Sequence, residues 1–404
     1  MSAPGTAGRL RALDVFRGAT VALMILVNNP GSWSHLYPPL AHAPWHGMTP
    51  TDLVFPFFLF AVGNALALVL PAHAAAPAAA FWRHVARRTV LIFAIGVALH
   101  AFPFVRWDAA GTLVARDLDG LRILGVLQRI ALAFGAAAAL VWLLGRSPRR
   151  VLAAAAALLL GYWVACRLLG GADPYSLEGY FGTALDRALL GPQHLYRGEG
   201  VPFDPEGLAS TVPAIAQVLL GWWAGEAVRR ARDAGAIDAG LLVRLCLAAI
   251  AFGVLAWLWQ LEFPLNKKIW SSSYVLATTS LALLALVAVL HLVEIRPRRA
   301  GGTPVPAAWV RGCEWFGRNA LFVFVLSGLV PRALALLRWP DGTGPSGEPR
   351  WITPLPWVWR TLFEPLGAVA GDPRLGSLAF ALANLAVFAL VARELDRRRI
   401  YVHV

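Results

Sequence analysis

The stretch AHAPWHGMTPTDLVFPFFLF, residues 41–60, joins a polar segment to a strongly apolar run. Two histidines, a tryptophan and an aspartate precede residues that are almost all apolar. Such a junction is either an ordinary loop that enters a buried helix or a reactive site at the edge of a membrane. The rest of the chain shows which environment surrounds it.

The composition excludes an ordinary soluble globule. The chain has 404 residues, of which 58% are hydrophobic and only 15% are charged, and its mean hydropathy is +0.60. A soluble protein carries about 25% charged residues. The chain therefore has too little polar surface to stay in solution and enough apolar sequence for many membrane spans.

The apolar runs predict an all-α polytopic membrane protein with about ten transmembrane helices, since each span needs about 20 mostly apolar residues. We treat residues 1–404 as a single transmembrane domain. Two further apolar pieces, around 354–368 and inside 171–208, contain Pro and Gly and are expected to be re-entrant or interfacial. The predicted spans are 12–30, 51–70, 88–105, 122–144, 151–169, 209–227, 240–260, 272–293, 314–331 and 375–393.

Basic clusters predict the orientation of these spans. They occur in every second connection and at both termini, which by the positive-inside rule puts both termini in the cytoplasm. The extracytoplasmic loops are then those near 30–50, 170–208 and 332–374, and no Lys or Arg occurs from residue 18 to residue 82. The clusters are Arg9/Arg11, Arg83/Arg87/Arg88, Arg146/Arg149/Arg150, Arg229/Arg230/Arg232, Arg296/Arg298/Arg299 and Arg397/Arg398/Arg399.

This alternation also explains the formal net charge of +13, so we predict no nucleic-acid partner.

The three cysteines, Cys166, Cys246 and Cys313, form no CxxC pair, which argues against a disulfide framework or a metal knuckle. The N-terminal apolar run lacks a small-residue cleavage site, and we expect a retained span. GxGxxG, Walker, GxSxG and HExxH motifs are absent from the sequence.

The opening stretch contains a helix start and two histidines. Thr49 suits an N-cap, Pro50 the first helical position, and Asp52 the carboxylate of a capping box, with orientation of a histidine as a second role. His42 and His46 can accept and return protons near neutral pH. Their i, i+4 spacing is interrupted by Pro44, so we predict no metal site.

Further polar residues interrupt the apolar spans or stand at their ends. Each alone has a structural interpretation as a cap, a snorkelling cation or a helix–helix hydrogen bond. Together they outline a polar cavity through the bundle. The set comprises Asn28, Asn29, Gln128, Arg129, Asp204, Glu206, Asn266, Lys267, Lys268, Trp270 and Asn319.

Several of these motifs together resemble the heparan-α-glucosaminide N-acetyltransferase family of transmembrane acyltransferases. The family pairs a DxFRG-type first span with an HxxWxGxTxxDLVFPxFxFxxG entry to the second, which here read DVFRG and HAPWHGMTPTDLVFPFFLFAVG. Similarity continues through GVLQRI, DPEGLASTVPAIAQVLLGWWAG, NKKIWSSSYV, GRNALFVF and RRRIY. The chain looks like a catalytic-domain-only, bacterial-type member of this family.

The resemblance implies transfer of an acetyl group from cytoplasmic acetyl-CoA to an extracytoplasmic amino sugar or glycan, in a bacterial inner membrane. It implies that His42 is the active-site histidine and Asn28 its partner, with Asp52 the third catalytic residue. To acetyl-CoA we assign Arg129, Gln128, Asn266, Lys267 and Asn319. To the acceptor we assign His46, where the animal pattern has asparagine, with Trp45, Asp204 and Glu206.

Several alternatives stay open at this stage. Transfer is either direct or through a transient acetyl-histidine, and the acceptor group is an amine or a hydroxyl. A homodimer is one assembly we allow for. The competing function is a multi-span transporter or flippase that moves a polar solute without acyl chemistry. The lack of an internal repeat counts against a repeat-built transporter.

Overall fold

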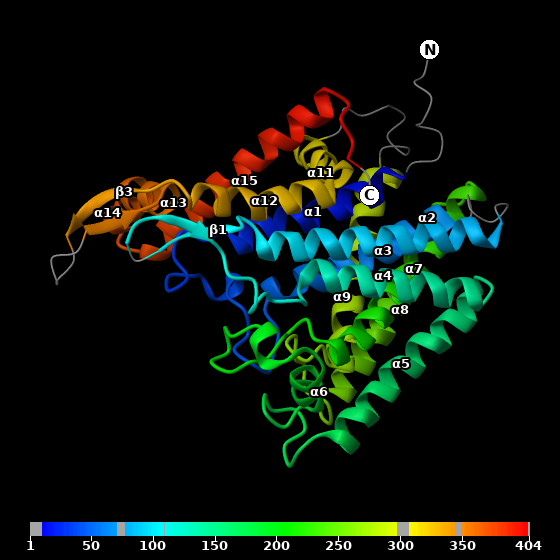
Figure 1. Ribbon diagram of the computed structural model, residues 1–404. Coiled ribbons are helices and arrows are strands. Elements are labelled where there is room, and N and C mark those ends of the chain that lie inside the picture. Colours follow the sequence, from blue (N-terminus) through cyan, green and yellow to red (C-terminus); the bar gives the residue numbers. More distant parts are fainter. Residues whose placement is uncertain (1–9, 71–76, 109, 297–306, 344–348, 403–404) are drawn as a thin grey trace.

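The structure is a computed structural model that describes residues 10–70, 77–108, 110–296, 307–343 and 349–402 (Figure 1). It is a bundle of long helices with two small antiparallel hairpins, β1 with β2 and β3 with β4. The long helices are α1 (Arg11–Asn28), α2 (Val54–Val69), α3 (Ala78–Ala101), α4 (Val126–Leu143), α5 (Pro148–Leu169), α7 (Leu208–Asp233), α8 (Ala239–Trp259), α9 (Ser272–Leu290), α11 (Ala308–Arg318), α12 (Ala320–Leu334) and α15 (Pro373–Arg397).

Shorter elements lie in the connections. They are η1 (Pro38–Leu40), η2 (Pro50–Leu53), β1 (Val105–Trp107), β2 (Leu113–Ala115), α6 (Phe181–Leu190), η4 (Pro192–His194), η5 (His291–Ile295), β3 (Trp339–Thr343), β4 (Pro349–Ile352), α13 (Pro354–Val358), η6 (Trp359–Phe363) and α14 (Glu364–Val369). The apolar pieces expected to be re-entrant or interfacial correspond to α6 and to the run from α13 to α14.

The predicted all-α polytopic class is confirmed. Within the described ranges, eight helices are long and apolar enough to cross a membrane, and a ninth span results if α11 and α12, bent by 81° to each other, count as one. The remaining predicted span is α1, which is only 18 residues long and contains Arg11, Asp14 and Arg17. Of the basic clusters, Arg9, Arg298 and Arg299 lie outside the described residues.

Helix α3 begins ten residues before its predicted start at residue 88, at Ala78. Its first turns carry Arg83, Arg87 and Arg88, which the hydropathy pattern assigned to a loop. Arginine is a good helix former, so the helix continues beyond the apolar run.

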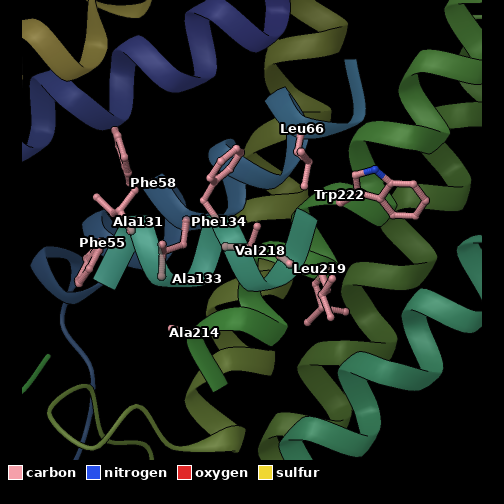
Figure 2. Close-up of a cluster of buried hydrophobic side chains, with 14 of the residues drawn as sticks. Phe55, Phe58, Leu66, Ala131, Ala133, Phe134, Ala214, Val218, Leu219 and Trp222 are labelled. Atoms are coloured by element: carbon pink, nitrogen blue, oxygen red, sulfur yellow. The ribbon is translucent and has the colours of Figure 1, made fainter. Parts of the chain in front are cut away.

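The centre of the bundle is formed by α2, α4 and α7. In the most apolar 18-residue stretch of α7, 78% of the residues are buried. The same share is 22% in α8, whose apolar side chains face outward. Figure 2 shows Phe58 of α2, Phe134 of α4 and Val218 of α7 in one cluster. The connection that carries His42, both hairpins and the run from α13 to α14 gather at one end of the bundle, on the left in Figure 1.

Two glycines allow α2 and α7 to approach closely. A Cβ on Gly63 would meet the backbone of Val218 and Trp222, and a Cβ on Gly221 would meet the backbone of Phe60. Within a bilayer, small residues of this kind let helix backbones come into contact. This contact fixes the position of α2, which continues directly from η2, the turn that carries Asp52.

We predict that Gly221→Ala lowers the thermal stability of the protein in detergent, because the added methyl must displace backbone; overpacking of this kind costs about 1–3 kcal/mol. Gly161→Ala in α5 is the matched control, since a Cβ there meets nothing within 4 Å. Scanning fluorimetry of both variants checks the prediction. Equal unfolding midpoints for the two variants would contradict it.

Candidate active site

A buried carboxylate holds the first histidine of the opening stretch. Nδ1 of His42 lies 2.6 Å from Oδ1 of Asp52, and Asp52 is 1% exposed. An ionised carboxylate only accepts hydrogen bonds, so Nδ1 carries the proton and donates it. In the neutral imidazole, Nε2 is then the basic nitrogen. The His42 side chain is 41% exposed, so this nitrogen is accessible to a substrate.

The same carboxylate starts α2. Its Oδ2 accepts the backbone N–H groups of Thr49 and Ala43, each at 3.0 Å. The capping box predicted from Thr49 and Asp52 is therefore present. The hydroxyl of Tyr274 on α9 donates to the backbone carbonyl of Asp52 at 2.5 Å. Asp52 thus combines the cap and the orienting role, which the sequence had offered as separate interpretations.

Lys267 lies beside both His42 and Asp52. Its Nζ lies 3.1 Å from Nδ1 and 3.3 Å from Nε2 of His42, and 3.5 Å from Oδ1 of Asp52. Burial lowers the pKa of Lys267, and the charges of Asp52 and Glu206 oppose that shift. We call His42, Asp52 and Lys267 the histidine cluster.

The loop that carries Lys267 is rigid because Asn266 organises it. The buried Asn266 side chain accepts the N–H groups of Lys268 at 2.8 Å and of Ile269 at 3.0 Å. The N–H of Gly47 donates to the carbonyl of Leu265 at 2.8 Å, which attaches this loop to the histidine loop. Asn266, predicted to bind acetyl-CoA, therefore has a structural task.

Lys268 joins three loops. Its Nζ donates to the Pro44 carbonyl at 2.7 Å and to Glu199 at 2.6 Å, and it lies 5.7 Å from the ring centre of Trp45. Trp45 in turn donates its indole N–H to the carbonyl of Tyr175 at 2.9 Å. The segments around residues 45, 200 and 267 are thereby held against one another.

His46 lies beside the histidine cluster. Burial lowers the pKa of His46, against the opposing charge of Asp173. The neutral ring is consistent with its Nδ1 accepting the amide of Asn266, at 3.4 Å. Trp45 and His46 therefore lie on the same loop as His42, against the loop of Asn266 and Lys268.

Asp204 and Glu206 form an ion-pair cluster with Arg122. The Arg122 guanidinium donates to both carboxylate oxygens of Asp204, at 2.9 and 2.7 Å, and to Glu206 at 2.5 Å. Because the charge of Glu206 acts on Lys267, this cluster adjoins the histidine cluster. The two acids are predicted to contact the acceptor, whereas Arg122, the first residue of the predicted span 122–144, is not singled out by the sequence.

Arg129 lies beneath this region. It is fully buried (0% exposed) and donates to the carbonyl of Pro205 at 2.7 Å and to the hydroxyl of Ser210. Its guanidinium also lies 5.0 Å from the ring centre of Trp270. These contacts of Arg129 hold the start of α7 against the loop of Lys267. The predicted contact between Arg129 and acetyl-CoA stays a prediction.

Asn28 and Gln128 line a cavity of about 360 Å³, which we call the His100 cavity. Its wall also contains Trp33, His100, Arg122 and Arg332. Among the described residues, Asn28 and His42 share no hydrogen bond. Asn28 therefore lies at the His100 cavity. Arg122 lies in the wall of the same cavity and belongs to the ion-pair cluster. The catalytic role of Asn28 stays a prediction.

A second cavity, of about 390 Å³, lies where α1 and α3 begin and α2 ends, and we call it the Arg88 cavity. Arg17, His84, Arg88 and Arg318 lie in its wall. Nε of Arg88 and Nε of Arg318 are buried without a hydrogen-bond partner in the described part of the chain. The sequence does not single out this site, because Arg88 belongs to a basic cluster that the topology already explains and Arg17 and Arg318 are far from it along the chain.

Asn319, predicted to bind acetyl-CoA, holds the end of the described chain beside the Arg88 cavity. Its side chain donates to the carbonyl of Ile400 at 3.0 Å and accepts the N–H of Val402 at 2.9 Å. Val402 lies in the cavity wall. Among the described residues, no group of three or more His, Cys, Asp or Glu side chains is arranged to hold a metal ion.

Fold and site together define a polytopic helical membrane protein with a carboxylate–histidine–lysine cluster at the meeting point of its loops. A family model described as a domain of unknown function, DUF5009, matches residues 9–135. Heparan-alpha-glucosaminide N-acetyltransferase of Homo sapiens is 27% identical over 379 residues, covering 78% of this chain and 52% of the relative. The Mus musculus protein of the same name is 26% identical over 375 residues, covering 79% and 53%.

These matches confirm the resemblance drawn from the motifs. The chain is related, at a distance, to the heparan-α-glucosaminide N-acetyltransferases. It spans about half the length of the curated relatives it matches. The DUF5009 match extends from α1 into α4 and includes both His42 and Asp52.

We predict that Asp52→Ala and Thr49→Ala both lower the unfolding midpoint, because each removes part of the α2 cap, worth about 1 kcal/mol. Only Asp52→Ala releases His42. The Nδ1–H tautomer of His42 should therefore persist in Thr49→Ala and become mixed in Asp52→Ala. Nitrogen chemical shifts of the imidazole measure this difference, and an unchanged tautomer in Asp52→Ala would contradict the orienting role.

Proposed function

We propose that this protein is a membrane-embedded acyltransferase that moves an acetyl group from cytoplasmic acetyl-CoA to an extracytoplasmic amino sugar or glycan. The observation that carries the proposal is the contact between the exposed ring of His42 and the buried carboxylate of Asp52. A histidine held by a carboxylate in one tautomer is the arrangement that general-base acyl transfer requires. The similarity to N-acetyltransferases supports the same chemistry.

In this mechanism, Nε2 of His42 accepts the proton of the acceptor's amino or hydroxyl group as that group attacks the thioester carbonyl carbon. The carbon–sulfur bond then breaks, and His42 returns the proton to the sulfur of the departing coenzyme A. Asp52 stabilises the imidazolium that exists between the two proton transfers. The alternative course, a transient acetyl group on His42, uses the same two side chains.

The Arg88 cavity suits the charged part of the donor. Arg17, Arg88 and Arg318 lie in its wall, and arginine binds phosphate oxygens through pairs of N–H groups. The predicted topology puts the starts of α1 and α3 in the cytoplasm, where acetyl-CoA is available. We therefore assign the nucleotide end of acetyl-CoA to this cavity rather than to Arg129, Lys267 and Asn319.

Both cavities are lined by the helices α1, α3, α4 and α12. On α1, Arg17 lies in the Arg88 cavity and Asn28 in the His100 cavity, eleven residues further on, which is about 16 Å along a helix. An extended pantetheine arm would bring the thioester from the first cavity toward the second. Asn28, Gln128 and His100 then face the acyl end of the donor.

We assign the acceptor to the opposite side, beside Trp45, His46, Asp204 and Glu206. The carboxylates there are paired with Arg122, so the acceptor would contact a polar surface with little net charge. We place the protein in a bacterial inner membrane, as its composition, rich in alanine, arginine and glycine, suggests.

We predict that purified protein in nanodiscs transfers label from radiolabelled acetyl-CoA to glucosamine-type acceptors, and that His42→Ala lowers kcat about 10²- to 10⁴-fold, the usual contribution of a general base. His35→Ala is the matched control, because His35 lies on the same loop and its ring contacts the hydroxyl of Ser32 at 3.2 Å. Label retained on the protein without acceptor would favour the acetyl-histidine course. Transport of a solute without consumption of acetyl-CoA would replace the proposal with the transporter function.

We predict that Arg88→Gln raises the Kd for acetyl-CoA about tenfold or more, since a hydrogen bond to a charged group contributes about 1.5–3 kcal/mol. Arg87→Gln, one residue earlier on the exposed face of α3, should bind normally. Calorimetry or filter binding with each variant measures the effect. Loss of binding in both variants alike would assign the nucleotide to another place.

A further inference from the structure

Lysine is rare in this chain. Of the 36 lysine and arginine residues, only Lys267 and Lys268 are lysines, and they are adjacent. Elsewhere arginine supplies every basic side chain. Lysine differs from arginine in presenting a compact ammonium that titrates when buried. The two lysines stand in the one loop that contacts the histidine cluster.

The two adjacent lysines, Lys267 and Lys268, have different surroundings. Lys268 is engaged by the carbonyl of Pro44 and the carboxylate of Glu199, and so serves to join loops. Lys267 instead contacts the ring of His42 and, at 3.5 Å, Oδ1 of Asp52. Its side chain is 23% exposed, and its Nζ lies 3.3 Å from Nε2 of His42. One lysine holds the site together, and the other lies within it.

The position of Lys267 is fixed before any substrate binds. Asn266 accepts two consecutive N–H groups of the turn, and its own N–H donates to the Ser271 hydroxyl at 3.0 Å. A charged donor held in a fixed place costs no reorganisation when negative charge develops nearby.

We infer that Lys267 is a catalytic residue whose ammonium stabilises the negative charge on the thioester carbonyl oxygen during acyl transfer. The inference rests on the proposed function. As the acceptor attacks the carbonyl carbon and gives its proton to Nε2 of His42, the carbonyl oxygen becomes an oxyanion beside Nζ of Lys267. The carbonyl reforms when the carbon–sulfur bond breaks, and the sulfur takes the proton from His42. Lys267 keeps its proton throughout.

This role requires the charged form of Lys267. Asp52, Glu206, His42 and Lys268 are the titratable groups that face it, and burial lowers its pKa from the ordinary value. As the pH rises through that lowered pKa, the ammonium is lost and the rate must fall. An alkaline limb below the ordinary lysine range should therefore appear in the pH profile of kcat. Arginine does not titrate in that range, so Lys267→Arg should remove the limb.

The experiment compares wild type, Lys267→Met, Lys267→Arg and the matched control Lys268→Arg in the acetyl-transfer assay across pH. We expect Lys267→Met to lower kcat about 10²- to 10³-fold, as removal of an oxyanion donor does, with a smaller change in KM for acetyl-CoA. Lys267→Arg should keep part of the rate without the alkaline limb. Lys268→Arg should keep that limb, whatever its effect on stability.

A second measurement does not depend on turnover. Amine-directed labelling followed by mass mapping gives the pH dependence of labelling at both lysines, and Lys267 should react at lower pH than Lys268. If wild type transfers acetyl and Lys267→Met is as fast, the role of Lys267 is overturned while the proposed function stands. If wild type transfers no acetyl to any acceptor, the proposed function fails and this inference falls with it. Normal folding of Lys267→Met, checked by its unfolding midpoint, excludes a structural cause.

Discussion

The carboxylate of Asp52 is the interaction on which the site depends. One oxygen accepts the N–H of Thr49, which caps the turn η2 that leads into α2, and the N–H of Ala43 in the histidine loop, and the other holds Nδ1 of His42. A carboxylate that is 1% exposed must have partners, because an unpaired buried charge is strongly destabilising. The cap fixes where the carboxylate lies, and the carboxylate then fixes the imidazole. Helix stability and site geometry are thus satisfied by the same side chain.

The histidine cluster lies where three connections meet rather than within any one helix. Lys268 and Asn266 attach the loop after α8 to the loop before α2, and Trp45 attaches the latter to the segment before α6. Catalytic groups on loops need such support, since small displacements lower the rate steeply. Many of the polar residues around the site serve this purpose. Their hydrogen bonds give several of the predicted ligands a structural task, while their contacts with acetyl-CoA or the acceptor stay predictions.

Charge is divided between the two ends of the bundle. In the wall of the Arg88 cavity, Arg17 is paired with Asp14 and Arg318 with Asp396, whereas Nε of Arg88 is buried without a hydrogen-bond partner among the described residues. At the His100 cavity, Arg122 is paired with two carboxylates. An anionic donor would therefore be favoured at one end and a polar acceptor at the other. The helices α1, α3, α4 and α12, which line both cavities, link the two ends.

The sequence by itself determined the membrane class, most of the spans and the capping box at Thr49 and Asp52, because hydropathy and helix caps are local properties. It offered Asp52 as a cap and as a partner of a histidine, but it could not reveal that one carboxylate does both for His42, or that Lys267 joins them from 225 residues away. Those facts depend on which loops meet in space. The positions of these loops depend on tertiary structure. They are fixed by the packing of α2 against α7, through Gly63 and Gly221, and by the hydrogen bonds among the loops.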